Sequence, residues 1–240
     1  MNVNDVKNVA SKVDFVFSAV DMKKEEILAI EEEYAKTETP VVSNNSAHRW
    51  TKDVPMVIPE INIEHFEIIE AQKKRLGTTK GFVAVKPNCS IQSYVPALTA
   101  WKEFEPYEVV ATTYQAISGS GKTFKEWPEM VENIIPFIDG EEEKSEKEPL
   151  RVWGKIENDE IKIASDINIT CQCVRVPVLN GHTAAVFVKF KKKPTKEQLI
   201  AKLREYKGFP QEAKLPSAPA QFIQYMDEDN RPQVKLDVDF

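Results

Sequence analysis

The sequence predicts an α/β protein with two parts: a small parallel sheet in residues 1–85, and a mixed sheet with helices on one face in residues 86–240. Near the N-terminus, two short apolar runs flank a charged helical stretch, and strands joined through a helix pair in parallel. Farther along, several strand-like runs follow one another with few helices between them, which favours a mixed or antiparallel sheet. With 240 residues, the chain can bury a core in one large domain or in two small ones.

The first part is expected to begin with a strand at residues 13–20, a run of β-branched and aromatic side chains that ends in small ones. A helix with a charged outer face follows at 22–36, and a second short strand at 40–42. Helical spacing resumes at 64–76. The strand, helix, strand order is the reason for expecting a parallel sheet here.

The second part follows a strand at 82–85, which leads directly to the Pro-Asn-Cys sequence that ends at Cys89. A helix is expected at 90–103, which places Cys89 near a helix N-terminus. The remaining expected elements are strands at 107–114, 161–163, 167–176 and 184–190 and a helix at 195–206. The run of glutamates and lysines at 141–148 is interpreted as a solvated loop.

The composition excludes several classes of protein. The net charge of −6 comes without a dense cluster of Lys and Arg, which argues against nucleic acid as a partner. No apolar run reaches the ~18 residues that a membrane helix needs, and the N-terminus lacks the basic and apolar regions of a signal peptide. The sequence therefore predicts a cytoplasmic protein without a membrane partner.

The cysteines differ in their surroundings. No metal site is expected, because the three cysteines and three histidines show neither CxxC nor HxxxH spacing. Cys171 and Cys173 alternate as residues on one strand face do, so we interpret them as small residues packed in a sheet. Cys89 lies between a predicted strand and a predicted helix, where unsatisfied N–H groups and the helix dipole stabilise a thiolate. The alternative for Cys89 is an inert buried thiol.

Two further residues suit chemistry on an anionic acyl substrate that a thiolate would capture as a thioester. His182 follows a glycine and precedes a strand, so we expect an exposed imidazole that exchanges protons near neutral pH. The alternative is a histidine that hydrogen-bonds only its own turn. Arg175, seven residues earlier, lies in an otherwise apolar strand and must meet an anion there, either a carboxylate of the protein or one of the substrate.

Two polar turns are candidates for binding phosphate and a cofactor. Arg49 follows the Ser-Asn-Asn sequence at 43–45, whose backbone donors suit an oxyanion; the alternative is an ordinary surface arginine. The glycine-containing turn at 118–121 permits close approach of a flat cofactor ring; the alternative is a flexible loop.

A resemblance to a known family is carried by four segments, which read Ser-Asn-Asn-Ser-Ala-His-Arg at 43–49, Pro-Asn-Cys-Ser at 87–90, Gln-Ala-Ile-Ser-Gly at 115–119 and Arg-Val-Pro-Val-Leu-Asn-Gly-His-Thr at 175–183. Together they resemble aspartate-semialdehyde dehydrogenases of the archaeal and fungal branch, over nearly the whole chain. The resemblance implies NADP-dependent reduction of aspartyl-4-phosphate to aspartate 4-semialdehyde, with release of phosphate, in the biosynthesis of lysine, methionine and threonine. It also implies that residues 1–85 are the remnant of a Rossmann-like NADP-binding domain, that 86–240 form the catalytic and dimerisation domain, and that the protein is a dimer or tetramer.

The resemblance implies a role for each matching residue. The catalytic and substrate-binding residues would be Cys89 as the thioester nucleophile, His182 as the general acid/base, Gln115 against the acyl group and Arg175 on the substrate carboxylate. The phosphate would contact Arg49 and Asn88, and the cofactor would lie against Ser18, Ala19, Ser118 and Gly119. The family also uses a Glu for the substrate ammonium and a Lys three positions later for phosphate. Two pairs have this spacing, Glu141 with Lys144 and Glu148 with Arg151, and both stay open.

One expected feature is absent. The family opens with a glycine-rich turn that holds the cofactor pyrophosphate, but the first glycine of this chain is Gly77. The chain is therefore expected to be an internal section of a longer protein, with weak NADP binding and little turnover of its own. Two alternatives stay open: a related reductase that acts on an acyl-CoA or another acyl phosphate, and a substrate-domain module without hydride transfer.

Overall fold

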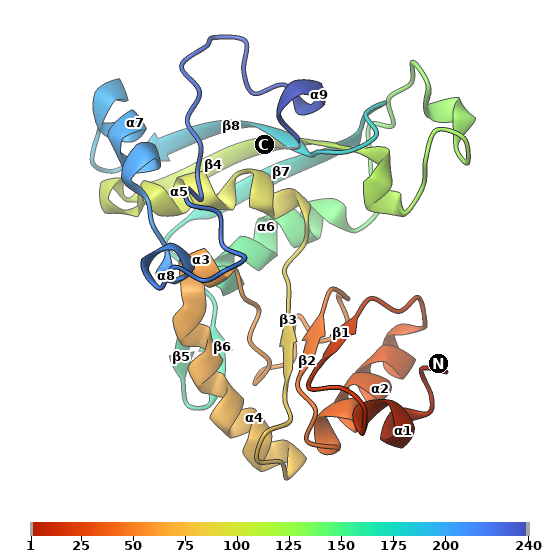
Figure 1. Ribbon diagram of the computed structural model, residues 1–240. Coiled ribbons are helices and arrows are strands. Elements are labelled where there is room, and N and C mark those ends of the chain that lie inside the picture. Colours follow the sequence, from red (N-terminus) through yellow and green to blue (C-terminus); the bar gives the residue numbers. More distant parts are fainter. Residues whose placement is uncertain (1, 239–240) are drawn as a thin grey trace. The chain divides into compact units, whose positions relative to one another are not determined.

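The computed structural model describes residues 2–238, which separate into two compact units (Figure 1). The first unit combines the residues up to Pro87 with Arg151–Ala164. The second combines Asn88–Leu150 with the described residues from Ser165 on. Within residues 2–238, no helix is both long enough and apolar enough to cross a bilayer.

The first unit is built on a three-stranded parallel sheet in the order β1 (Val16–Ser18), β2 (Val41–Ser43), β3 (Val83–Val85). Helix α2 (Lys24–Lys36) connects β1 to β2 and buries Ile27, Ile30 and Tyr34, which lie at helical spacing. The predicted parallel strand, helix, strand unit is therefore confirmed. The first strand is shorter than the predicted 13–20, and Phe15 and Phe17 are exposed.

The remaining elements of the first unit are α1 (Val6–Ala10), α3 (Pro59–Asn62), the 3-10 helix η1 (Ile63–Ile68), α4 (Ile69–Leu76) and the antiparallel hairpin of β5 (Lys155–Glu157) and β6 (Glu160–Lys162). Gln72 on α4 satisfies the outer edge of β3, because its Oε1 accepts the Val83 N–H at 2.6 Å and its Nε2 donates to the Val83 carbonyl at 2.9 Å. Gly81 precedes β3 where a Cβ would lie 1.7 Å from the Ala35 carbonyl oxygen. Only a glycine fits between β3 and the end of α2.

The second unit contains the predicted mixed sheet. Strand β4 (Pro106–Gln115) lies between β7 (Asn168–Arg175), which is parallel to it, and β8 (Thr183–Phe190), which is antiparallel. The buried face carries Val109, Ala111, Thr113 and Gln115 of β4 and Ile169, Cys171, Cys173 and Arg175 of β7. Cys171 and Cys173 are free thiols packed in the sheet, as predicted. Gln115 pairs with Arg175 at the carboxyl ends of the two parallel strands.

Helices α5 (Val95–Ala100) and α6 (Glu141–Val152) lie on one face of this sheet (Figure 1). The prediction of one helix at 90–103 was wrong: the segment forms a 3-10 turn η2 (Ser90–Ser93), then α5, then η3 (Lys102–Phe104). Tyr94, with φ −139°, leaves helical geometry between the first two. The other helical elements are η4 (Ile117–Ser120), η5 (Pro128–Met130), α7 (Lys196–Glu205), α8 (Phe209–Glu212) and α9 (Val234–Asp237). The helix predicted at 195–206 is confirmed as α7, with Thr195 as its N-cap.

The solvated loop predicted at 141–148 was also wrong, because this run forms most of α6. Glutamate and lysine are good helix formers, and Glu143 pairs with Lys147 one turn later at 2.6 Å. The inner face of the helix buries Ser145 and Glu148. The segment is therefore a structural element with a polar buried face.

Candidate active site

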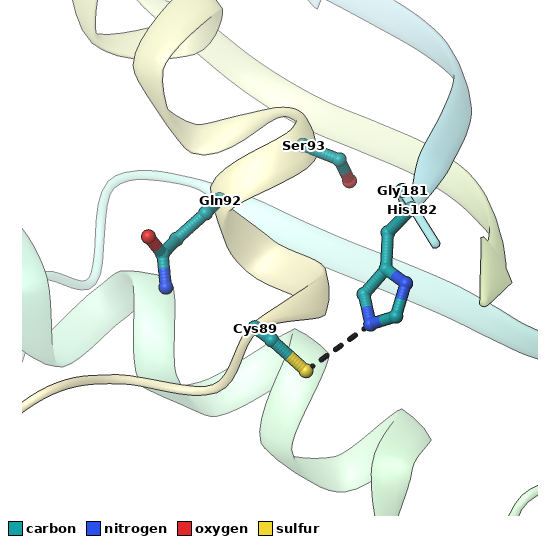
Figure 2. Close-up of a pocket in the computed structure, with 5 residues that line it drawn as sticks. All are labelled: Cys89, Gln92, Ser93, Gly181 and His182. Atoms are coloured by element: carbon teal, nitrogen blue, oxygen red, sulfur yellow. Dashed lines mark hydrogen bonds between the residues drawn. The ribbon is translucent and has the colours of Figure 1, made fainter. Parts of the chain in front are cut away.

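The thiol of Cys89 faces the imidazole of His182 in the second unit (Figure 2). The Cys89 Sγ lies 3.2 Å from the His182 Nε2, although the residues are 93 positions apart in sequence. Cys89 is exposed and caps the 3-10 turn η2, and His182 immediately precedes β8. The helical element that follows Cys89 is thus shorter than predicted, and the exposure of Cys89 argues against the alternative of an inert buried thiol.

The second ring nitrogen of His182 fixes its tautomer. Nδ1 accepts the backbone N–H of Ala116 at 3.1 Å, so the neutral ring carries its proton on Nε2. That proton points toward the Cys89 sulfur. A donor in this position stabilises a thiolate, because hydrogen bonds to charged acceptors are stronger than those to neutral ones. The Ala116 amide could not be predicted from the sequence, because almost every residue carries a backbone N–H.

A polar cluster surrounds the turn before Cys89. The Glu141 carboxylate accepts from the Asn88 Nδ2 at 2.9 Å, from the Gln115 Nε2 at 3.4 Å and from the Lys144 Nζ at 2.7 Å. Burial opposes ionisation of Glu141, but the hydrogen bonds from Lys144 and Asn88 outweigh it and lower its pKa. Three residues predicted from the sequence thus meet at the carboxylate of a fourth, Glu141.

Arg175 projects from the buried face of the sheet beside this cluster. It is 6% exposed, and its Nη1 donates to the Ala116 carbonyl at 2.7 Å. Burial lowers the pKa of the guanidinium, and the nearby Glu141 carboxylate opposes that shift. A Cβ on Gly119 would lie 3.0 Å from the Arg175 Nη1 and 3.1 Å from the His182 Cε1, so the bare backbone of Gly119 lets the η4 turn approach both side chains.

The two candidate pairs of glutamate and basic residue differ in their surroundings. Lys144 binds Glu141 within the cluster. Glu148 is 1% exposed and accepts the Asn88 backbone N–H at 2.5 Å. Arg151 belongs to the first unit, where its Nη2 donates to the carbonyls of Thr51 and Val54 at 2.7 and 3.0 Å and burial lowers its pKa to about 10.

Three further predicted residues lie in the first unit. Arg49 is buried, not on the surface, and its guanidinium donates to the carbonyls of Lys86 and Asn44 at 3.0 and 3.3 Å. Ser18 ends β1, and its Oγ accepts from the Asn45 Nδ2 at 3.1 Å. Ala19, the next residue, is exposed. These positions are at the carboxyl edge of the parallel sheet.

The pocket at the thiol is lined by Cys89, Gln92, Ser93, Gly181 and His182 (Figure 2). Gln92 and Ser93 were not predicted as site residues. They follow Cys89 by about one helical turn, and this spacing could have placed them beside the thiol. Among residues 2–238, no group of three or more His, Cys, Asp or Glu is arranged to hold a metal ion.

Comparison with known proteins matches both units to one family. The model described as "Semialdehyde dehydrogenase, dimerisation domain" matches residues 98–240, and "Semialdehyde dehydrogenase, NAD binding domain" matches residues 1–69. An aspartate-semialdehyde dehydrogenase of Archaeoglobus fulgidus is 39% identical over 94% of this chain and 64% of its own length. A malonyl CoA reductase (NADP) of Metallosphaera sedula is 33% identical over 87% of this chain and 58% of its own length.

A solved structure agrees with these matches. The crystal structure of aspartate semialdehyde dehydrogenase with NADP from Candida albicans has a TM-score of 0.83 to this chain at 32% identity, and the match covers 95% of this chain and 66% of that one. The chain spans less than two thirds of the length of the curated relatives it matches, 64% for the Archaeoglobus enzyme. The resemblance inferred from the motifs is confirmed. Because a family model extends over more than half of its length, this chain belongs to the semialdehyde dehydrogenase family.

Proposed function

We propose that this chain takes part in the NADP-dependent reductive dephosphorylation of aspartyl-4-phosphate to aspartate 4-semialdehyde, a step of amino-acid biosynthesis. The observation that carries the proposal is the 3.2 Å contact between the Cys89 sulfur and the Nε2 of His182, beside a cluster that can bind an amino acid. A thiol and an imidazole in this arrangement suit covalent catalysis at an acyl carbon.

In the first half-reaction, Cys89 acts as the nucleophile. The thiolate attacks the acyl carbon, the sulfur–carbon bond forms, the bond from that carbon to the phosphate oxygen breaks, and phosphate leaves with the electron pair. Because Cys89 is exposed, its proton can pass to solvent, while the Nε2–H of His182 stabilises the negative sulfur.

In the second half-reaction, the thioester is reduced and released. A nicotinamide cofactor, when bound, supplies the hydride that the carbonyl carbon requires. We assign to His182 the stabilisation of the negative oxygen that then develops and the role of acid/base, because its Nε2 lies 3.2 Å from the reacting sulfur. When the carbonyl reforms, the sulfur–carbon bond breaks and Cys89 returns as a thiolate.

We assign substrate binding to the cluster of residues around Glu141. We assign the substrate carboxylate to Arg175, the acyl group to Gln115, and the ammonium to Glu141, whose carboxylate already meets Asn88 and Gln115. Of the two candidate pairs, the geometry favours Glu141 with Lys144, because Glu148 is turned onto a backbone amide. The candidates for the phosphate are Lys144 and Asn88 in the second unit and, separately, Arg49 in the first.

NADP is assigned to the residues at two places. Ser18 and Ala19 end β1 at the carboxyl edge of a parallel sheet, where such sheets bind nucleotides. Ser118 and Gly119 are exposed on the η4 turn, next to Arg175 and His182. Residues 1–85 would accordingly form the remnant of the NADP-binding domain and 86–240 the catalytic and dimerisation domain. We also propose that the protein is a homo-oligomer in the cytoplasm.

Acylation of the thiol tests this function without a cofactor. After incubation with synthetic aspartyl-4-phosphate, intact-protein mass spectrometry should detect one aspartyl adduct that hydroxylamine removes, as expected for a thioester. Cys89→Ser should abolish the adduct, and Cys171→Ser, which changes a buried thiol, should retain it. An adduct that persists in Cys89→Ser, or no adduct on the unaltered chain, would reject the proposed nucleophile.

The second candidate is a reductase of an acyl-CoA, favoured by the 33% identity to a malonyl CoA reductase. The aspartyl phosphate and malonyl-CoA hypotheses differ in the role of Glu141, because a malonyl group has no ammonium for this carboxylate to bind. Incubation with malonyl-CoA in place of aspartyl phosphate distinguishes them. Faster acylation of Cys89 by malonyl-CoA would favour the second candidate.

A further inference from the structure

Helix α6 turns one polar face toward the segment that carries Cys89. Ser145 and Glu148 lie about one turn apart on that face. The Glu148 Oε2 accepts the Asn88 backbone N–H at 2.5 Å, and the Ser145 Oγ lies 3.0 Å from the Ser90 Oγ. The residue before Cys89 and the residue after it are therefore both held by the same helix.

The turn is also closed from within. The Asn88 Oδ1 accepts the Ser90 N–H at 2.7 Å and the Ser90 hydroxyl at 2.6 Å, an arrangement that ties the two neighbours of Cys89 to each other. The Tyr94 hydroxyl donates to the Ser145 carbonyl at 2.5 Å, which fixes the far end of the 3-10 turn. These contacts determine where the Cys89 sulfur points.

Burial distinguishes Glu148 from another carboxylate of the same helix. Glu148 is 1% exposed, and a buried carboxylate is costly unless hydrogen bonds compensate. The hydrogen bond that it accepts from the Asn88 amide at 2.5 Å compensates part of this cost. Glu146 also accepts a backbone N–H, that of Cys171 at 3.0 Å, but it is half-buried and touches β7 instead of the Cys89 turn.

We propose that Glu148 is a positioning residue for the nucleophile: through the Asn88 amide, its carboxylate holds the turn that keeps the Cys89 sulfur within reach of the His182 Nε2. The inference rests on the proposed function, because it takes Cys89 as the nucleophile. It gives two glutamates of one helix face separate tasks, since Glu141 faces the substrate cluster and Glu148 the backbone. A misplacement of about 1 Å at a reacting group can slow a reaction about 100-fold.

Alkylation of Cys89 by iodoacetamide, followed by intact-protein mass spectrometry, tests this role without a substrate. Glu148→Ala should slow alkylation at neutral pH about tenfold, the factor that corresponds to one hydrogen bond. Glu148→Gln keeps an acceptor oxygen at the same reach and should restore the rate to within about twofold. A folded Glu148→Ala variant that reacts at the unaltered rate overturns the proposal, as does a Gln variant as slow as the Ala variant.

A double-mutant cycle separates positioning from a general loss of structure. If Glu148 acts by holding Cys89 against His182, Glu148→Ala combined with His182→Ala should react no more slowly than His182→Ala alone. If the two substitutions together slow alkylation by the product of their separate factors, the inference is contradicted. Glu146→Ala is the matched control, because it removes a carboxylate on the same helix that also accepts a backbone N–H, and it should react at the unaltered rate.

One additional variant and one parallel measurement complete the experiment. If circular dichroism shows that Glu148→Ala does not fold, Glu148→Asp replaces it, because its carboxylate keeps the charge but falls one methylene short of Asn88. The same slowing is expected, and an unaltered rate refutes the inference. Acylation by aspartyl-4-phosphate is measured in parallel: its absence in the unaltered chain refutes the proposed function, while the alkylation cycle still decides the role of Glu148.

Discussion

The two ring nitrogens of His182 have different partners, and this arrangement determines whether the imidazole donates or accepts a hydrogen bond at Cys89. Nδ1 is occupied by the Ala116 N–H, so the neutral ring meets the sulfur as a donor through Nε2. The backbone of the same residue is held a second time, because the Arg175 Nη1 donates to the Ala116 carbonyl. Arg175, Ala116 and His182 therefore form one connected chain that ends at the thiol.

This chain predicts the effect of changing Arg175. A lysine presents one ammonium in place of the guanidinium fork, so it cannot bind the Ala116 carbonyl and a substrate carboxylate with the same geometry. For Arg175→Lys we expect the aspartyl phosphate concentration that gives half-maximal acylation to rise about tenfold, as expected for the loss of one charge-assisted hydrogen bond. The rate at saturation should change less. Stopped acylation reactions analysed by mass spectrometry measure both quantities.

Arg204→Lys is the matched control for this variant. Arg204 is a surface arginine of the same unit, bound to Asp227, so its replacement should leave both quantities unchanged. Equal half-saturation in Arg175→Lys and the unaltered chain would remove Arg175 from substrate binding and leave it with its Ala116 contact alone.

At the scale of elements, the packing of α2 against β3 depends on one glycine. A Cβ on Gly81 would lie 1.7 Å from the Ala35 carbonyl oxygen and 3.1 Å from the Glu38 Cα, and both are backbone atoms that cannot rotate away. We expect Gly81→Ala to lower the free energy of unfolding by about 3 kcal/mol, the upper part of the usual range for an overpacked core. Urea denaturation followed by circular dichroism measures the change.

Gly77→Ala provides the comparison within the same unit. Gly77 has a φ of +73° and no atom within 4 Å of an added Cβ, so the substitution meets only backbone strain. It should cost about 1 kcal/mol. If both variants lose the same free energy, the close approach of β3 to α2 is not what requires Gly81.

The sequence predicted those elements whose side chains alternate or repeat with clear apolar spacing. The strands β4, β7 and β8 were found in this way because their runs are rich in β-branched residues, and the helix α7 because Leu199, Ile200 and Leu203 lie at helical spacing. Helix α6 was missed because its buried face is polar, with Ser145 and Glu148 in place of apolar residues. The break at Tyr94 was missed because it depends on tertiary contacts, including the bond of the tyrosine hydroxyl to Ser145.

In the candidate site, too, some residues could be predicted from their side chains and others depend on the fold. Cys89, Arg175 and His182 could be identified because a thiol, a guanidinium and an imidazole stand out from their neighbours in sequence. The choice between the two candidate glutamates could not be made, because Glu141 and Glu148 differ only in where the helix directs them. The Ala116 amide was not predictable either, since it acts through its backbone.

At the scale of the whole molecule, the outer face of the mixed sheet carries exposed apolar side chains. Phe187 of β8 is 77% exposed and lies opposite Val110 of β4, which is 47% exposed. Tyr114, farther along β4, is 39% exposed. Glu108 and Lys189 form an ion pair at 2.8 Å on neighbouring positions. An apolar centre with a charged border is typical of a surface that a protein partner covers.

In the proposed homo-oligomer, a second copy of the chain covers this face. The variant Phe187→Glu tests this interface. A buried carboxylate at the centre of the interface should raise the dimer dissociation constant about 30-fold or more, the effect of losing a central aromatic contact. Sedimentation velocity over a range of concentrations measures it. Phe209→Glu, which adds the same charge at an exposed phenylalanine of α8, should sediment as the unaltered chain does. A Phe187→Glu variant that still forms the unaltered oligomer would place the interface on another surface, because a dimer that buries this face cannot tolerate an unpaired carboxylate at its centre.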